Sequence, residues 1–148
     1  MYKDIVTIFN RYVDSFENTI WYPHVLSDVN LTVDKAAIVA KYGEVSKDNA
    51  VLNVRCHFAN GGIMVGNKPY LSPKEWERQT NDQLPNSITF TAGNDFDFFM
   101  LGDYGSEEPI VDEDGRFFSN MQDEYDYVYA ITSSAQYSVI PHFEITGK

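Results

Sequence analysis

The stretch AVLNVRCHF, from Ala50 to Phe58, alternates two sets of side chains and is the clearest strand pattern in the chain. Alternate residues of a strand point to the same face, so one face is predicted to carry Leu52, Val54, Cys56 and Phe58. On that face Cys56 is interpreted as a small core residue rather than as a nucleophile. The pattern predicts a half-buried strand of an antiparallel sheet.

Other stretches rich in β-branched and aromatic residues surround this strand. They predict further strands, with turns at VDSFENT, ANGG and AGND between them, over 4–12, 20–34, 63–71, 87–93, 95–102, 125–133 and 137–148. Pro23 lacks the backbone N–H that a sheet uses, so we expect an interrupted strand there, with Pro23 at an edge, a bulge or a strand start. The segment KAAIVAKYGE, 35–44, fits a strand or a short helix, and we favour the strand.

The stretch KPYLSPKEWERQT, from Lys68 to Thr80, changes from a strand pattern to a helix pattern. Ser72 is placed to cap a helix, Pro73 suits its first turn, and Glu75 stands three residues after the cap, as in a capping box. A short helix is therefore predicted from Pro73. Trp76 would face the body of the domain and anchor the helix.

The composition predicts one folded domain over residues 1–148, because 43% of the 148 residues are hydrophobic and 15% are aromatic. The formal net charge of -11 argues against unaided binding to nucleic acid or to an anionic membrane. A single cysteine excludes an intramolecular disulfide and a cysteine-based zinc cluster. The first dozen residues resemble neither a signal peptide nor a membrane anchor, so we expect a cytoplasmic protein.

Acidic residues dominate the segment 103–126, where nine carboxylates face one base, Arg116. We predict an exposed acidic loop or insertion, with a helical turn at FFSNMQDEY. Unpaired charges are costly to bury, so Asp112, Glu113 and Asp114 are interpreted as a solvated acidic turn and as candidate interaction residues. The stretches DFDFF and EYDYVY predict strands with rings on one face and carboxylates on the other.

No motif for catalysis, nucleotide binding or a metal stands out. The three histidines, His24, His57 and His142, fall on different predicted strands without a metal-ligand spacing. The stretch VDEDGRFF lacks the Asp spacing and the closing Glu of a calcium loop. We therefore expect no cofactor and no metal, and each histidine is interpreted as a surface or pocket residue.

The order of these segments is similar to that of a known class of proteins. DIVTIFNRY, then WYPHVLSDVNL, AVLNVRCHF, YLSPKEWE and a closing YSVIPHFEITGK resemble small virion proteins of prophages and long-tailed phages. These are called minor structural (minor capsid), head-closure or head–tail connector proteins. The resemblance covers nearly the whole chain, while the acidic segment 103–126 is longer than in the compact pattern of that class.

The resemblance implies a ligand-free antiparallel β-barrel and a structural role. It also implies a homo-oligomeric ring that contacts portal or adaptor proteins and tail proteins, first in the host cytoplasm and then at the head–tail interface of the virion. The fold expected overall is a mainly β barrel or sandwich with one or two short helices and an acidic loop. Two alternatives stay open: an acidic inhibitor that mimics nucleic acid, such as a phage anti-defence protein, and a small enzyme of unknown class.

Overall fold

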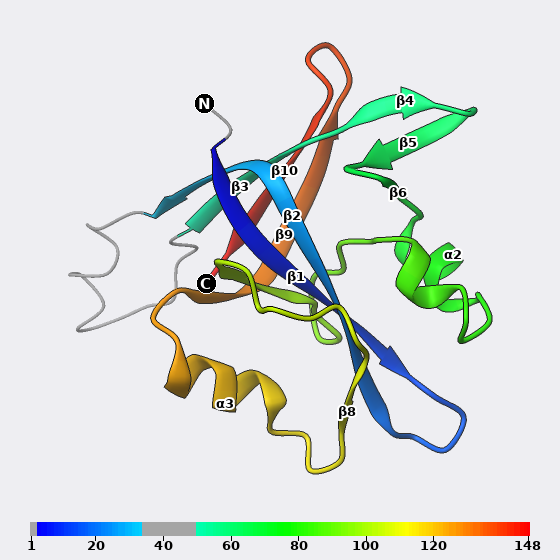
Figure 1. The fold of residues 1–148 in the computed structure, drawn as a ribbon, viewed down its shortest axis with the longest axis vertical. Coiled ribbons are helices and arrows are strands. Elements are labelled where there is room, and N and C mark those ends of the chain that lie inside the picture. The colour runs from blue at the N-terminus through cyan, green and yellow to red at the C-terminus, as the bar shows by residue number, and fades with distance from the viewer. Residues whose placement is uncertain (1–2, 34–49) are drawn as a thin grey trace.

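The computed structural model describes residues 3–33 and 50–148 (Figure 1). The fold is mainly β, and six antiparallel strands form a closed barrel in the order β1-β7-β9-β10-β3-β2, with β2 paired again to β1. The barrel strands are β1 (Asp4–Val13), β2 (Thr19–Val33), β3 (Ala50–Arg55), β7 (Phe98–Leu101), β9 (Val128–Tyr137) and β10 (His142–Gly147). The expectation of a small antiparallel barrel is confirmed.

β2 is one continuous strand of 15 residues, so the predicted interruption at Pro23 is wrong. Pro23 lies opposite Phe9 of β1, and the N–H of Val25 points away from β1 and donates to Glu107 Oε2 at 2.7 Å. Alternate residues direct their N–H groups to the same edge of a strand, so the N–H that Pro23 lacks would also face away from β1. The proline therefore removes no hydrogen bond between β1 and β2.

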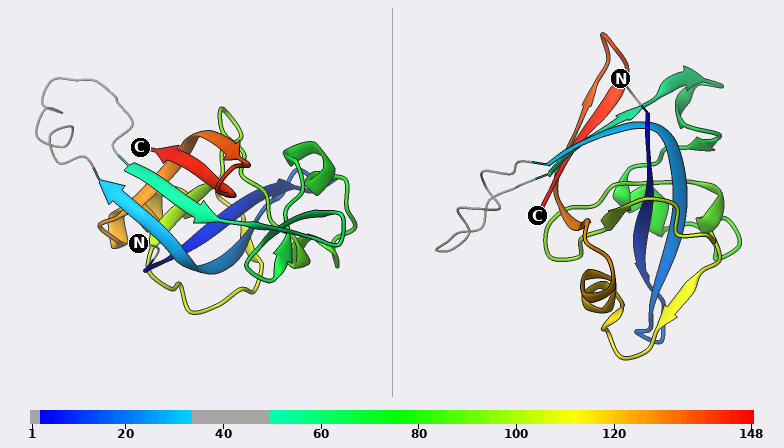
Figure 2. Two further views of the ribbon diagram at one scale, coloured as in Figure 1. Left: turned by 90° about the horizontal axis from the view of Figure 1, so that it is seen from above. Right: turned by 60° about the vertical axis from the view of Figure 1, so that its left-hand side comes forward.

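β2 bends strongly where it passes from its pairing with β1 to its pairing with β3 (Figure 2). The register with β1 shifts between Asp4 and Val6, which leaves one extra residue in β2. Asp28 lies in that interval with a φ of 58°, a left-handed conformation that a β-bulge accommodates. The bulge allows β2 to pair with β1 along its first part and with β3 along its last part.

The chain leaves the barrel after Cys56. Leu52, Val54 and Cys56 are buried as predicted, but Phe58 is 56% exposed and the prediction for this side chain is wrong. The reason is that β4 (His57–Ala59) belongs to a separate small sheet with β5 (Gly62–Val65) and β6 (Lys68–Pro69). The predicted ANGG turn joins β4 to β5, with positive φ at its central residues Asn60 and Gly61.

The helix predicted at Pro73 is present as α2 (Pro73–Glu77). Ser72 has an extended backbone before the helix, and the Glu75 carboxylate accepts hydrogen bonds from Ser72 N at 3.2 Å and Ser72 Oγ at 3.0 Å. Trp76 is 2% exposed, and its Nε1 donates to the carbonyl of Ser87 at 3.2 Å. The predicted anchor is confirmed.

Of the two strands predicted over 87–93 and 95–102, only part of the second is a strand, β7. The first prediction is wrong: after the 3-10 turn η2 (Leu84–Asn86), the buried residues 87–90 make a single bridge, between Ile88 and Tyr70. Their backbone groups find separate partners instead. Leu71 N donates to Ile88 O, and Asn10 exchanges two hydrogen bonds with the backbone of Thr89.

Three hydrophobic clusters hold the fold together. The largest fills the barrel with Leu52, Val54, Phe143, Ile145 and their neighbours. A second cluster lies under β8 (Ile110–Asp112) and α3 (Phe117–Glu124) and is built on stacked Phe9 and Phe98 rings 4.5 Å apart. The third joins α2 to the barrel through Trp76, Tyr22 and Leu84.

One glycine is required by close packing. A Cβ at Gly147 would lie 2.9 Å from the Cβ of Tyr129 and 3.1 Å from the ring of Phe99, so only glycine lets β10 pass this point. The prediction for 35–44 falls outside the described residues. Among the described residues, no helix combines the length and the apolar character needed to cross a membrane.

We expect Trp76→Ala to lower the free energy of unfolding by about 3–5 kcal/mol, because it removes the largest side chain of the cluster that fastens α2. Urea denaturation measures this change. Phe16→Ala is the matched control, since Phe16 is an exposed aromatic residue in the β1–β2 turn; its effect should stay within about 0.5 kcal/mol. An unchanged stability in the Trp76 variant would mean that α2 is an appendage.

Candidate functional site

The acidic segment 103–126 is not a simple loop. β8 pairs with the start of β2, and α3 packs over the second cluster, so much of the segment is regular structure. The predicted helical turn at FFSNMQDEY is confirmed as α3. Of the nine carboxylates, eight are exposed and one, that of Asp112, is buried.

Asp112 has a structural role that the sequence analysis missed. Its Oδ2 accepts a hydrogen bond from Trp21 Nε1 at 3.1 Å, and its Oδ1 accepts one from the backbone N–H of Arg116 at 3.1 Å. The N–H of Phe117 also donates to this carboxylate at 3.3 Å. A carboxylate at this end of a helix satisfies free N–H groups and suits the helix dipole. The prediction that Asp112 belongs to a solvated turn is therefore wrong, while Glu113 and Asp114 are exposed.

Asp97 is a second buried carboxylate, and its position contradicts the predicted separation of rings and acids in DFDFF. It is 1% exposed, next to the buried Phe98. Three N–H groups donate to it: Arg11 N to Oδ1 at 2.8 Å, Thr91 N to Oδ2 at 2.8 Å, and Asn10 Nδ2 to Oδ2 at 2.9 Å. The predicted alternation of rings and acids fails because Asp97 precedes β7 and its carboxylate faces β1 and Thr91 instead of solvent.

Burial raises the pKa of Asp97 to about 7, and the hydrogen bonds from Arg11, Thr91 and Asn10 oppose the shift. The group links β1 to the segment 89–97. Its position inside the fold, with donors from the backbone, marks it as a structural carboxylate. A signal in the sequence was the amide residue Asn10, which directly follows the apolar pair Ile8 and Phe9 in the strand.

His24 is fully buried on β2, and its Nδ1 lies 2.8 Å from Lys68 Nζ. Lys68 also forms an ion pair with Glu107 at 3.2 Å. Burial, with a contribution from the charge of Lys68, lowers the pKa of His24 to about 3, so the imidazole is neutral and Nδ1 accepts the hydrogen bond. The proton then lies on Nε2, which has no hydrogen-bond partner among the described residues. The contacts among His24, Lys68 and Glu107 hold β6 against β2. Glu107 also accepts the N–H of Val25 at the edge of β2 that does not pair with β1.

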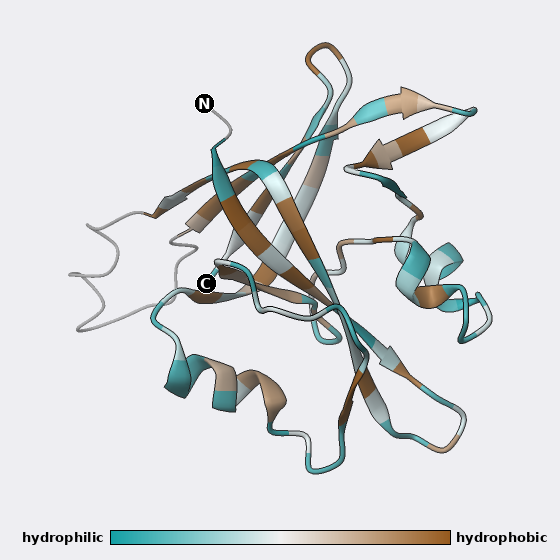
Figure 3. Ribbon diagram, viewed as in Figure 1, coloured by the Kyte–Doolittle hydropathy of each residue, from teal (hydrophilic) through white to brown (hydrophobic). Residues whose placement is uncertain are grey.

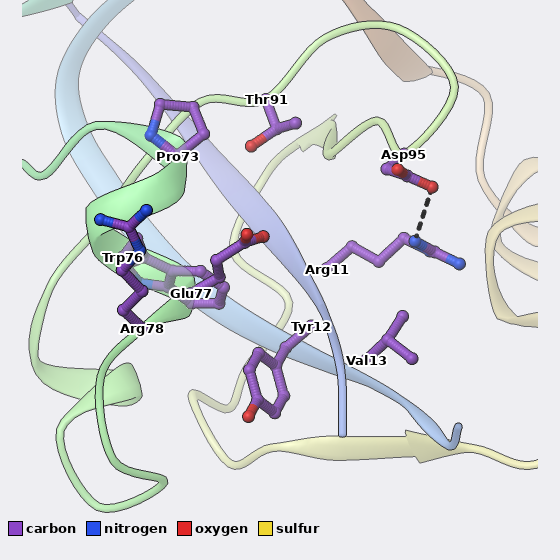
Figure 4. A pocket seen from close by; sticks show the side chains of 9 residues that line it. All are labelled: Arg11, Tyr12, Val13, Pro73, Trp76, Glu77, Arg78, Thr91 and Asp95. Atoms are coloured by element: carbon purple, nitrogen blue, oxygen red, sulfur yellow. Dashed lines mark hydrogen bonds and ion pairs between the residues drawn. The ribbon is translucent and has the colours of Figure 1, made fainter. Parts of the chain in front are cut away.

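A cavity of about 510 Å³ lies between the end of β1, α2 and the turn before Asp97 (Figure 4). Two arginines, Arg11 and Arg78, and two acids, Glu77 and Asp95, line it, so its charged side chains sum to zero. Arg11 is paired with Asp95 at 3.2 Å. The cavity does not present the clustered positive charge that phosphate binding needs.

The three histidines lie on the separate strands β2, β4 and β10, as expected, but His24 is fully buried, so the prediction that it is a surface or pocket residue is wrong. Within residues 3–33 and 50–148, no group of three or more His, Cys, Asp or Glu side chains is placed to hold a metal ion.

The surface feature that stands out is apolar. The turn between β9 and β10 carries Val139, 97% exposed, and Ile140, 72% exposed, and Phe58 of β4, in the small sheet, is 56% exposed. Figure 3 shows the hydrophobic colour at the tip of this hairpin, which extends beyond the barrel. The hydrogen bond from Cys56 N to Pro141 O ties the turn to the point where the chain enters β4. Large apolar side chains that stay exposed in this way are candidates for burial in an interface with a partner.

We expect Asp112→Asn to destabilise the protein by about 1–3 kcal/mol, because one of the two carboxylate oxygens that accept hydrogen bonds becomes an amide NH2, which can only donate and would face an N–H group. The matched control, Glu113→Gln with Asp114→Asn, alters exposed acids in the same turn and should change stability by less than about 0.5 kcal/mol. Urea denaturation separates the two variants. Equal effects would show that Asp112 is not a structural residue.

Because the raised pKa of Asp97 exceeds the ordinary value of about 4, the unfolded chain binds fewer protons than the folded one between these values. Over this range Asp97 ionises in the unfolded chain but stays protonated in the folded one. The free energy of unfolding therefore falls as the pH rises from about 4 to about 7. The carboxyl ¹³C resonance of Asp97 should titrate with a midpoint near 7 in the folded protein. A midpoint near 4 would contradict the assignment.

No curated protein and no solved structure matches this chain. One protein family does match, over residues 1–148. The match covers the whole sequence, including the acidic segment and the closing strand. The chain therefore belongs to DUF6751, a family of unknown function.

Proposed function

We propose that the protein is a non-catalytic structural component of a phage virion that joins head to tail. The proposal draws on the order of segments that resembles head-closure proteins and on a barrel whose interior is filled by side chains. Its partners would be copies of itself in a ring, portal or adaptor proteins, and tail proteins. It would fold in the host cytoplasm and end at the head–tail interface.

The observation that carries this proposal is the exposure of three large apolar side chains, Val139 and Ile140 in the β9–β10 turn and Phe58 on β4 of the small sheet. In water, each of these side chains loses the free energy that burial would provide, about 25 cal/mol for every Å² left exposed. A protein that acts by joining neighbours has a use for such side chains, because an assembly interface buries them. Phe58 lies on strand β4, and the turn that carries Val139 and Ile140 joins strands β9 and β10 directly.

The exposed acids favour a position beside DNA without binding to it. Glu113, Asp114 and the acids of α3 present negative charge on one region of the surface. A surface of this sign repels phosphates, which suits a passage through which DNA must slide.

The eight exposed acids of the segment 103–126 also favour a second candidate function, an acidic inhibitor that mimics nucleic acid. That function requires a basic partner, and its binding would weaken strongly with salt. Glu113→Gln with Asp114→Asn would weaken such binding, whereas it would leave the exposed apolar side chains of Phe58, Val139 and Ile140 unchanged.

In a phage that encodes this protein, deletion of the gene should leave DNA-filled heads and separate tails, because the joint is missing. Electron microscopy of the lysate checks the particle types. Expression of the wild-type gene in trans should restore joined particles, and it serves as the control. Joined, infectious particles without the gene would refute the proposed function.

A further inference from the structure

The turn between β9 and β10, residues 138–141, is a compact apolar projection, called here the tip. The side chains of Val139 and Ile140 at its centre are largely exposed to solvent. The tip is held in a defined position, because His142 Nδ1 lies 2.6 Å from Ile140 O and the rings of Tyr137 and His142 stack with centroids 5.0 Å apart. A held apolar projection loses little conformational entropy when it is buried.

The same chain carries an open apolar groove between the β4–β5 hairpin and the start of α2. Phe58, Ile63, Tyr70 and Leu71 line it, and its volume is about 790 Å³. The tip of the same copy does not line this groove. Glu75 also lines the groove, and its carboxylate accepts hydrogen bonds from Ser72. The volume of the groove gives room for a pair of aliphatic side chains beside the apolar lining residues.

The tip and the hairpin side of the groove share one electrostatic property, whereas Glu75 contributes a carboxylate on the α2 side of the groove. The chain has 22 acids, yet none occurs in 50–74, which forms the hairpin side of the groove, or in 127–143, which forms the tip. Two copies of a protein with a net charge of -11 repel each other over most of their surfaces. Contact between these two acid-free segments avoids that repulsion, which favours a second copy of this chain as the occupant of the groove.

We propose that the tip of one copy docks into the groove of the next. The tip and the groove are different surfaces, so the contact is heterologous: each copy uses its tip toward one neighbour and its groove toward another. Repetition of such a contact closes into a ring or extends as an open chain. This inference rests on the assembly role proposed above and assigns the surfaces through which copies meet.

Sedimentation velocity of the purified full chain over a range of concentrations tests the contact. Val139→Ser with Ile140→Ser removes the tip, and Phe58→Asp places a charge in the groove; all three positions are exposed, so folding should be retained. Each variant should weaken self-association by about a hundredfold, since two buried aliphatic side chains or one buried ring are lost. Val111→Ser and Phe16→Asp, at exposed positions on β8 and in the β1–β2 turn, are the matched controls and should associate like the parent.

A mixing experiment distinguishes the heterologous contact from a symmetric one. The tip variant keeps its groove and the groove variant keeps its tip, so each alone should stay monomeric while an equal mixture forms dimers. A groove variant that self-associates as strongly as the parent would overturn the proposal, because the contact would then be tip to tip.

Salt provides an independent check. Screening of the net negative charge should strengthen the parental association between about 0.05 M and 0.5 M NaCl, as the Debye length shrinks. An association that weakens with salt would contradict the proposal and indicate a contact through the acidic segment. A chain that stays monomeric in every condition would also refute this contact, yet it would leave the head–tail role to stand or fall on the gene deletion.

Discussion

The hydrogen bonds around Asp97 set the arrangement of the whole molecule. Its carboxylate accepts hydrogen bonds from Asn10 and Arg11 of β1 and from Thr91, and its carbonyl accepts the N–H of Ile131 in β9. These bonds fix the segment 87–91, of which residues 87–90 are buried, against the barrel, although that segment is no strand. The same segment supplies the Ser87 carbonyl that receives the indole N–H of Trp76. Asp97 and the Ser87–Trp76 hydrogen bond therefore help to fix α2, and with it one side of the apolar groove, on the barrel.

Local patterns in the sequence predicted what local forces determine. The barrel strands followed from the alternation in Ala50–Phe58 and similar stretches, and α2 followed from a cap, a proline and a capping-box acid that act within one turn. The errors arose where a distant partner decides. Phe58 is exposed because the chain changes sheets after Cys56, and Pro23 sits in a continuous strand because its missing N–H faces the edge that β1 does not use.

The two buried acids show the same limit for the candidate site. Asp112 and Asp97 look like surface residues in an acidic chain, and only the tertiary fold brings Trp21 and Asn10 to them. The exposed apolar tip was equally hidden, because Val139 and Ile140 extend a strand pattern in the sequence and a turn in the structure. The composition did predict the sign and the amount of the net charge. The fold determines where this charge lies: acids gather around α3, whereas the tip and the hairpin side of the groove contain none.

This distribution leads to an account in which a rigid barrel presents apolar contacts to protein neighbours and negative charge elsewhere. Its central claim is that the protein is a part of the finished particle. Gold-labelled antibodies against the chain, applied to purified phage particles and viewed by electron microscopy, test that claim directly. The account predicts label at the joint between head and tail in most particles. Particles free of label, with the protein recovered only from the soluble fraction of the lysate, would contradict it.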